Sequence, residues 1–259
     1  MEIDWKDEIL YKELVMWDTR LKREAPFFQD ILTNLQKKDA KFLDVSCGTG
    51  DHMVMFAKWG FTGKGIDISE QNIEQAKLLA QKNNCSEKME FVLGDILELE
   101  NNFPDEKFDF IFCIGNTLSI FDKDERSRIV NQMLKLLNKN GVILIQAVNY
   151  LSHQENDQWF YNPSLKRNSD GTLIFHVRMM EWKNKFDKIT MYVHKILQKA
   201  NESEEFDLHK KRTEFFVISE KDFEELTEDN IKVDIFGDYE RKKFDEKESN
   251  DLVIILKKI

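Results

Sequence analysis

Short apolar segments alternate with amphipathic ones from residue 40 to residue 150. Five short segments are predicted to be strands: 41–46, 62–67, 89–93, 108–114 and 142–148. Three of the stretches between them carry apolar side chains at helical spacing: 48–58, 69–82 and 123–137. Ser69 is the predicted N-cap of the second helix, and Asn140-Gly141 is expected to end the third. Strands that alternate with helices form a parallel sheet covered on both faces, so the pattern predicts a doubly wound α/β core.

The pattern changes on both sides of this core. Upstream, residues 3–36 place apolar side chains at mostly helical spacing, and Pro26 is expected to divide them into two helices. Downstream, three segments have the pattern of antiparallel strands joined by turn residues: 172–182, 187–198 and 205–217. A short helix and two further strands are predicted after them: 219–227, 231–236 and 252–256. The chain is therefore predicted to have four regions: 1–38, 39–150, 151–217 and 218–259.

Composition and charge narrow the class of protein. With 259 residues, of which 41% are hydrophobic and 33% charged, the chain fits a soluble globular protein, and its net charge of −10 disfavours nucleic acid as a partner. The cysteines (Cys47, Cys85 and Cys113) are odd in number and lack CxxC spacing, which indicates a reduced, cytoplasmic protein. No segment has the apolar length of a signal peptide or of a membrane span. The five histidines form no ligand cluster, so no metal site is predicted.

The turn SCGTGD after the first predicted strand carries the first candidate chemistry. Gly48 and Gly50 allow a ligand to approach the backbone, and the helix after them offers N–H groups. A dinucleotide fingerprint would have a further glycine where Met53 stands. Asp44 is costly in a buried strand unless it makes defined hydrogen bonds, and it would repel a pyrophosphate. The turn therefore favours a cationic or zwitterionic ligand and argues against a nicotinamide oxidoreductase.

Two further carboxylates end the next strands. Asp67 can accept both ribose hydroxyl protons, and its alternative role is to cap the helix that follows. Asp95 ends the third strand, where an adenine amino group could donate to it, although it could equally be a turn residue. Because the carboxyl ends of parallel strands share one edge of the sheet, Asp44, Asp67 and Asp95 are expected to border one ligand.

The motifs DVSCGTG, GIDIS, GDI and FDFIFCIGNTL, in this order over roughly residues 40–150, resemble those of class I S-adenosylmethionine-dependent methyltransferases. The resemblance implies a Rossmann-like sheet of seven strands, the last one antiparallel, and S-adenosyl-L-methionine as the cofactor. It assigns the methionine part to the glycine turn, the ribose to Asp67 and the adenine edge to Asp95. The cofactor-binding residues that it implies in this region are Asp44, Gly48, Thr49, Gly50, Asp67, Ile68, Asp95, Ile96 and Ile114.

The upstream segment YKELVMWDTRLKREAPFF is similar to the N-terminal segment of the small-molecule subgroup near glycine N-methyltransferase. This similarity implies that Tyr11, Trp17 and Arg20 fold over the cofactor and that Arg20 holds its carboxylate. Lys22 or Arg23 would take that role if the register shifts. The alternative is that the two aromatic residues are ordinary core residues and that Arg20 faces water.

The fourth motif, Ile114-Gly115-Asn116-Thr117, is where methyl transfer is expected. Asn116 is the predicted catalytic residue, because its side chain and the strand-end carbonyls can position an amine or hydroxyl by hydrogen bonding. Methyl transfer from a sulfonium is an in-line displacement, in which positioning supplies much of the acceleration. The motif differs from the Asn/Asp-Pro-Pro-Tyr/Phe of enzymes that methylate adenine amino groups in nucleic acids or glutamine, which disfavours those acceptors.

The acceptor remains open at the level of the sequence. In the glycine-acting relatives an arginine precedes Asn-Tyr after strand five, but Val148 precedes Asn149-Tyr150 here, which makes glycine doubtful as the substrate. The predicted substrate residues are Asn116, Tyr150, Arg178 and Arg212. His176 and His209 lie on the same predicted strands as the two arginines, and the alternative favoured for each of these four residues is an ordinary surface or paired residue.

These observations predict a cytoplasmic S-adenosylmethionine-dependent methyltransferase that acts on an amine or hydroxyl of a small molecule. Residues 1–38 would form a helical cap over the cofactor, 39–150 the cofactor-binding core, 151–217 an antiparallel lid over the substrate, and 218–259 the end of the core sheet. An RNA or protein methyltransferase and a non-catalytic cofactor-binding protein are the alternatives. Assembly into a homo-oligomer is left open.

Overall fold

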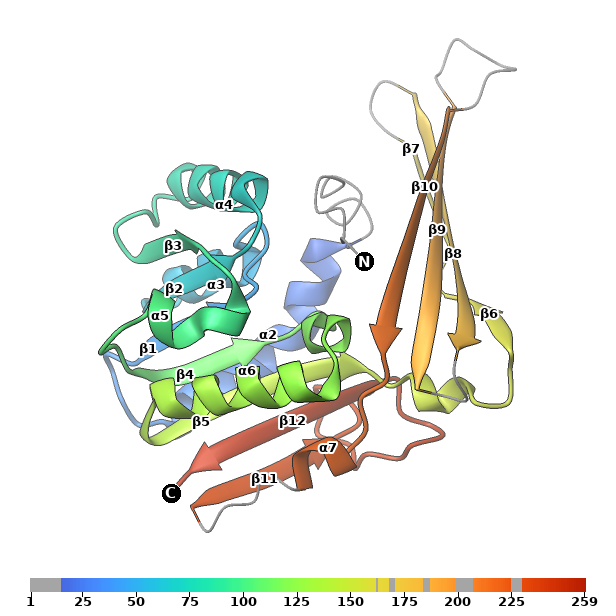
Figure 1. Ribbon diagram of the computed structural model, residues 1–259. Helices are drawn as coiled ribbons and strands as arrows, with labels where there is room; N and C mark the ends of the chain where they lie inside the picture. The colour runs from blue at the N-terminus through green and yellow to red at the C-terminus, as the bar shows by residue number, and fades with distance from the viewer. Residues whose placement is uncertain (1–14, 162, 168–170, 184–186, 199–206, 225–229) are drawn as a thin grey trace. The chain divides into compact units, whose positions relative to one another are not determined.

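The computed structural model describes residues 15–161, 163–167, 171–183, 187–198, 207–224 and 230–259. Its contacts divide the chain into two compact units, which are treated separately below (Figure 1). The core unit contains residues 16–149 and 218–259, and the insertion unit contains residues 150–217 together with Val15. The division falls close to the predicted insertion at 151–217, whose role as a lid stays a prediction.

The core unit is built on a seven-stranded sheet in the order β11-β12-β5-β4-β1-β2-β3 (Figure 1). Its strands are β1 (Lys41–Val45), β2 (Thr62–Asp67), β3 (Met89–Leu93), β4 (Phe108–Cys113), β5 (Leu137–Val148), β11 (Ile231–Phe236) and β12 (Asp251–Lys258). Strands β1 to β5 pair with one another in parallel, whereas β12 runs antiparallel to both β5 and β11. The predicted doubly wound sheet with an antiparallel last strand is therefore confirmed.

Helices cover both faces of this sheet. They are α2 (Trp17–Asn34), α3 (Asp51–Lys58), α4 (Glu70–Lys82), α5 (Leu99–Asn102), α6 (Lys123–Leu136) and α7 (Lys221–Glu224), with 3-10 turns η2 (Ile96–Glu98) and η3 (Thr117–Ile120). Side chains alternate between the faces along each strand. In β4, Phe110 and Phe112 pack in the cluster that contains α2 and α3, while Ile111 and Cys113 pack in the cluster that contains α6. The sheet thus has one apolar core on each face.

Pro26 does not divide the first helical segment, which corrects the predicted break. Helix α2 continues through it, because apolar residues on the far side of the proline are buried on the same face: Phe27, Phe28, Ile31 and Leu32. A proline inside a helix costs about 3 kcal/mol, which the burial of this face outweighs. Pro26 and Lys22, whose carbonyl loses its helical donor, are both exposed, so water can hydrogen-bond that carbonyl.

Helix α6 ends earlier than predicted. Leu137 is already extended (φ −81°, ψ 133°) and begins β5 opposite Phe108. The register of β4 on β5 shifts between Phe108 and Phe110, and Asn140 has a φ of 62° within this irregular stretch. Asn140-Gly141 therefore belongs to a bulge in the strand and does not end the helix. Burial of the Leu137 side chain in the α6-side core favours the early strand.

The insertion unit is an antiparallel sheet. Strands β10, β9, β8 and β6 follow one another in this order, and β7 also pairs with β8. Their bounds are β6 (Gln158–Phe160), β7 (Ser164–Arg167), β8 (Leu173–Lys183), β9 (Lys188–Gln198) and β10 (Asp207–Phe216), after a 3-10 turn η4 (Tyr150–His153). The three long strands were predicted, whereas β6 and β7 are too short for an alternating pattern to reveal them. Among the described residues, no helix combines the length and apolar character needed to cross a bilayer.

Candidate functional site

The turn between β1 and α3 is sharply bent. Ser46, Gly48 and Gly50 all have left-handed backbone, with φ of 68°, 53° and 78°. Gly50 is the N-cap of α3, and Thr49 is buried with its hydroxyl donating to the Asp51 carboxylate. The bend brings the backbone of the turn to the carboxyl edge of the parallel strands.

The two glycines of this turn have different surroundings. A Cβ atom on Gly48 would meet no atom within 4 Å, so Gly48 borders open space. A Cβ atom on Gly50 would lie 3.0 Å from the Ala76 Cβ and 3.0 Å from the ring of Phe91. Gly48 is therefore on the side available to a ligand, and Gly50 is on the side packed against α4 and β3.

Asp67 joins the turn to the tip of β2. Its Oδ2 accepts the Gly48 N–H at 2.8 Å, and its Oδ1 accepts the Ser69 N–H at 3.1 Å and the Asn72 Nδ2 at 3.3 Å. Burial raises the pKa of Asp67, and these hydrogen bonds oppose the rise. A carboxylate has about four acceptor positions, so a ribose hydroxyl could use the remaining one and a second could displace the long Asn72 contact. The N-cap of α4 is Ser69, as predicted, and not Asp67.

Asp44 is a buried carboxyl in the middle of the sheet. It is 3% exposed, and it makes no hydrogen bond to any residue within the described ranges. Burial and the nearby charge of Asp67 raise its pKa well above the usual range, and the charge of Arg20 only partly opposes this. Burial therefore favours the protonated form of this carboxyl in the ligand-free protein. A positively charged group placed beside it would stabilise the ionised form.

The predicted adenine edge lies at the tips of β2 and β3. Asp95 caps the turn η2 by accepting the Leu97 N–H at 2.9 Å. Ile96 is buried in the α6-side core, so only its main chain could face a ligand. Ile68 and Leu93 are 44% and 52% exposed, and they follow and end neighbouring strands. Leu93 had not been predicted, because an apolar residue at a strand end gives no local sign of exposure.

Arg20 is turned toward the sheet. Its side chain is 15% exposed and its Nε donates to Glu24 Oε1 at 2.9 Å, whereas Lys22 is exposed and Arg23 is 59% exposed. The guanidinium of Arg20 lies 5.3 Å from the ring centre of Trp17, and its charge acts on Asp44. The alternative in which Arg20 faces water is therefore wrong. Tyr11 lies outside the described residues.

The side-chain oxygen of Asn116 is bound within the protein, and the predicted catalytic role of this residue stays a prediction. Its Oδ1 accepts the Val148 N–H at 2.8 Å and the Ser119 hydroxyl at 2.8 Å, so both lone pairs of the amide oxygen are engaged. These bonds hold the end of β4 to β5 while Asn116 keeps a left-handed φ of 69°. Ile114 is 7% exposed in the α2-side core. An acceptor at this motif would therefore meet the main chain, not the amide oxygen.

A polar chain that sequence reasoning missed crosses three strands behind this motif. Gln146 Oε1 accepts the Gly115 N–H at 2.8 Å, and Gln146 Nε2 donates to Asp251 Oδ1 at 2.7 Å. Burial raises the pKa of Asp251, although the Gln146 bond and the Arg23 charge oppose it. The available signal was Gln146 itself, a polar residue within the apolar run VILIQAV. Its partners could not be inferred from that run.

The two predicted substrate arginines of the insertion are not brought together. Arg178 pairs in register with Val193, and Arg212 pairs with Tyr192. Because Val193 and Tyr192 are consecutive in β9, the two arginines lie on opposite faces of the sheet. Arg212 is also half exposed and forms an ion pair with Glu214 at 2.7 Å. At most one of these arginines can face a given ligand.

The other candidates of the insertion unit have ordinary packing partners. Tyr150 is 3% exposed, and its ring centre lies 6.0 Å from that of Phe215. His176 is buried, and its Nδ1 lies 3.5 Å from the Ser164 hydroxyl. His209 is exposed on β10. Their predicted roles toward a substrate stay predictions.

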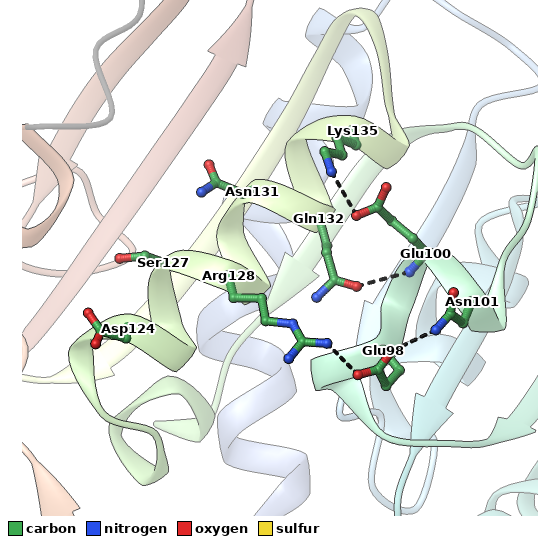
Figure 2. A pocket seen from close by; sticks show the side chains of 9 residues that line it. All are labelled: Glu98, Glu100, Asn101, Asp124, Ser127, Arg128, Asn131, Gln132 and Lys135. Atoms are coloured by element: carbon green, nitrogen blue, oxygen red, sulfur yellow. Dashed lines mark hydrogen bonds and ion pairs between the residues drawn. The ribbon is translucent and has the colours of Figure 1, made fainter.

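A polar hollow lies elsewhere on the core unit, between α5 and α6 (Figure 2). It is lined by Glu98, Glu100, Asn101, Asp124, Ser127, Arg128, Asn131, Gln132 and Lys135. Arg128 forms an ion pair with Glu98, and Lys135 forms one with Glu100 at 3.0 Å, so charges on α6 are paired with charges on the facing segment. The hollow contains none of the predicted site residues and is not a candidate site.

The donor-side geometry can be compared with known proteins. Residues 36–189 match the family model described as a methyltransferase domain. The chain belongs to this methyltransferase family. The predicted membership of the S-adenosylmethionine-dependent methyltransferases is thereby confirmed.

Curated relatives of this methyltransferase match over part of their length. Ajmaline N-methyltransferase of Rauvolfia serpentina is 30% identical over 155 residues, which are 60% of this chain and 50% of the relative. Glycine/sarcosine N-methyltransferase of Halorhodospira halochloris is 28% identical over 145 residues, which are 54% of this chain and 51% of the relative. The chain thus spans about half the length of the curated relatives it matches.

Solved structures resemble this methyltransferase over nearly its whole length. An S-adenosylmethionine-dependent methyltransferase from Clostridium acetobutylicum has a TM-score of 0.76 at 19% identity, with 97% of each chain covered. The SAM-bound amino pentose methyltransferase from Micromonospora echinaspora has a TM-score of 0.69 at 13% identity, with 100% of this chain and 98% of that chain covered. At these identities the likeness shows the fold.

Proposed function

We propose that this chain is an S-adenosylmethionine-dependent methyltransferase that methylates an amine or hydroxyl of a small molecule, with an amine favoured. The observation that carries the proposal is a buried carboxyl, Asp44, in the strand that leads into the turn where Gly48 borders open space. A ligand with a positive charge would fit this place. Both curated relatives named above are N-methyltransferases, which supports nitrogen as the accepting atom.

The donor side of the site has complementary groups for each part of the cofactor. Asp44 would face the α-ammonium of the methionine part, and Arg20 its carboxylate, because the Arg20 charge acts on Asp44 and the two side chains therefore lie near one another. Asp67 would accept the ribose hydroxyls, while Ile68 and Leu93 would contact the adenine ring. The bound cofactor would supply an electrophilic methyl group on a sulfonium. The protein would supply its orientation.

On the acceptor side, this chain would act by positioning. Gly115 and Asn116 have left-handed backbone (φ of 81° and 69°) and are held by the Gln146 and Val148 bonds, so the main chain there is set before an acceptor arrives. Such preorganisation favours an in-line displacement. An amine must lose a proton to expose its lone pair. Asp251, connected to Gly115 through Gln146, is the carboxyl that we propose to attract the amine and to take this proton.

The test of this proposal is direct. Isothermal titration calorimetry with S-adenosylhomocysteine is expected to give one site per chain, and methyl-tritiated cofactor is expected to label members of an amine and hydroxyl library. Absence of binding would refute the proposal. Preferential labelling of bulk RNA or protein would show that the acceptor class is wrong. Binding without transfer to any acceptor would indicate a non-catalytic protein.

Alanine substitutions at the two glycines of the turn are expected to have different effects on stability and on ligand binding. Gly50→Ala should lower the free energy of unfolding by about 1–3 kcal/mol, because its Cβ would crowd Ala76 and Phe91 at a left-handed φ. Gly48→Ala should cost only about 1 kcal/mol of backbone strain but weaken S-adenosylhomocysteine binding, because its Cβ enters the ligand space. Urea unfolding and calorimetry measure both quantities. Equal effects of the two variants on binding would contradict this assignment of the open space.

We also propose a reducing, cytoplasmic location. Cys47, Cys85 and Cys113 are all free and buried, as expected of a protein that does not depend on disulfides. Fractionation of cells that express the protein, with thiol labelling of the denatured chain, tests the location and the redox state together.

A further inference from the structure

We propose that Glu24 and His52 are positioning residues that hold Arg20 in the orientation needed to bind the carboxylate of the cofactor's methionine part. The inference rests on the proposed function, since it names the residues that support one of its binding groups. Neither residue was singled out by the sequence motifs.

Both oxygens of Glu24 have defined partners. Glu24 lies one helical turn after Arg20 in α2, and its Oε1 accepts from Arg20 Nε at 2.9 Å. Its Oε2 lies 2.7 Å from Nε2 of His52, in α3. Glu24 is 1% exposed and His52 is 5% exposed, so these bonds form away from water. The bond at Nε fixes the plane of the Arg20 guanidinium relative to α2.

Trp17 completes a closed set of contacts around Arg20. The Arg20 guanidinium lies 5.3 Å from the centre of the Trp17 ring, which is a cation–π geometry. The same ring meets His52 edge-on, with ring centres 5.6 Å apart and an interplanar angle of 78°. The Trp17 ring and the Glu24 carboxylate therefore both restrain Arg20. Each of these two groups also contacts His52.

The charges of Glu24 and His52 favour a guanidinium that stays in one orientation at Arg20. Burial lowers the pKa of His52, so the ring is neutral and its Nε2–H can donate to Glu24. Burial raises the pKa of Glu24, but the His52 bond and the Arg20 charge outweigh it and leave the pKa lowered. Glu24 is therefore an anion that compensates Arg20. Burial raises the pKa of the nearby Asp44, which disfavours its anionic form as a competitor for the guanidinium.

The cluster also connects Arg20 to the turn that borders the ligand space. His52 is the second residue of α3, two residues after Gly50. The Glu24–His52 bond therefore sets the position of α2 relative to the first turn of α3. A buried ion pair adds little net stability compared with apolar residues of the same volume, so stability alone does not account for this arrangement. A displacement of a binding group by about 1 Å can lower activity roughly 100-fold. The need to hold Arg20 in place therefore explains the buried Glu24–His52 contact.

The experiment compares two ligands that differ in the methionine part. S-adenosylhomocysteine has the carboxylate, and 5′-methylthioadenosine lacks it. In Glu24→Gln, which keeps the shape but loses the charge, the dissociation constant of S-adenosylhomocysteine is expected to rise about 10-fold or more, while that of 5′-methylthioadenosine stays within about twofold. Isothermal titration calorimetry measures both constants on the full chain.

A matched control and a rescue separate positioning from folding. Asp109→Asn removes a buried carboxylate that pairs with Lys37 at 2.7 Å, elsewhere in the core unit, and should leave the ratio of the two dissociation constants unchanged. His52→Leu should raise the ratio, whereas His52→Gln, whose amide nitrogen reaches the place of Nε2, should restore it.

The outcomes are distinguishable. If the wild-type chain binds S-adenosylhomocysteine and Glu24→Gln leaves the ratio unchanged, or weakens both ligands equally, the positioning role is wrong and the proposed function stands. If the wild-type chain binds neither ligand, the proposed function itself fails. A ratio that rises in Glu24→Gln and in His52→Leu, but not in Asp109→Asn, supports the positioning role.

Discussion

Replacing Asp67 with alanine is expected to lower the affinity for S-adenosylhomocysteine by roughly 100-fold, about 3 kcal/mol. Hydrogen bonds to a charged group are stronger than neutral ones, and Asp67 is the group proposed to accept the ribose hydroxyls. The same carboxylate also receives the Gly48 N–H at 2.8 Å, so its loss loosens the turn as well as removing the ribose contact. Both effects weaken binding.

Two comparisons isolate the ribose contact from the loosened turn. The wild-type chain should bind 5′-methylthioadenosine more tightly than its 2′-deoxy analogue, and Asp67→Ala should lose this preference. Asn72→Ala removes only the 3.3 Å contact to Asp67 and should keep the affinity within about threefold. Calorimetry of both ligands measures these ratios. A preference for the ribose hydroxyl that persists in Asp67→Ala would place the ribose elsewhere.

Replacing Asp44 with asparagine is expected to weaken binding and to stabilise the ligand-free protein at neutral pH. The loss of a charged partner for the α-ammonium should cost roughly 10- to 100-fold in affinity. The gain in stability has a separate cause. The pKa of Asp44 is raised in the folded state, so the folded protein holds a proton that the unfolded chain releases. Ionisation of the buried carboxyl therefore costs stability as pH rises.

The expected pH dependence of stability follows from the raised pKa of Asp44. The contribution of Asp44 to stability is fully present below the unfolded pKa, about 4, and is lost as pH rises toward the folded pKa. The advantage of Asp44→Asn over the wild type should therefore grow between pH 4 and pH 8, approximately, when followed by urea unfolding. Binding should release a proton in the wild type, detectable by calorimetry in buffers of different ionisation enthalpy, and should release fewer in the variant.

Asp109 is a control whose pKa shift has the opposite direction to that of Asp44. Burial raises its pKa, but the Lys37, Lys41 and Asn138 bonds outweigh burial and leave the pKa lowered. Its contribution is present above the unfolded pKa and is lost as pH falls. Asp109→Asn should therefore be less stable than the wild type at neutral pH and approach it in acid.

A stability difference in Asp44→Asn that shrinks with rising pH would contradict the assignment of Asp44 as a buried, protonated acid.

The sequence predicted those features that depend on residues near one another along the chain. Strands β2 and β3 have the predicted bounds. Ser69 was identifiable as an N-cap because the cap bonds the N–H of Asn72, three residues later. The two wrong boundaries, at Pro26 and at Leu137, are positions where burial in a core outweighed a local signal.

In the candidate site, too, the residues were predicted from local motifs, whereas their long-range partners were not. Asp44, Gly48 and Asp67 were predicted from motif spacing, and the parallel register of β1 on β2 brings them to one edge. Spacing could not show that the Asn116 amide oxygen is engaged by Val148, 32 residues away, or that Gln146 reaches Asp251, 105 residues away. Hydrogen-bond partners at such separations depend on which strands are neighbours.

The sequence by itself therefore determined the family, the order of the strands in the core sheet, and the carboxylates at the strand ends that are proposed to bind the cofactor. These features follow from periodicity, turn chemistry and short motifs, which are local. Only the tertiary structure decided that Arg20 and not Arg23 faces the sheet, that Glu24 contacts both Arg20 and His52, and that burial raises the pKa of Asp44. Those properties depend on burial and on charges brought together by packing, and no local pattern records either.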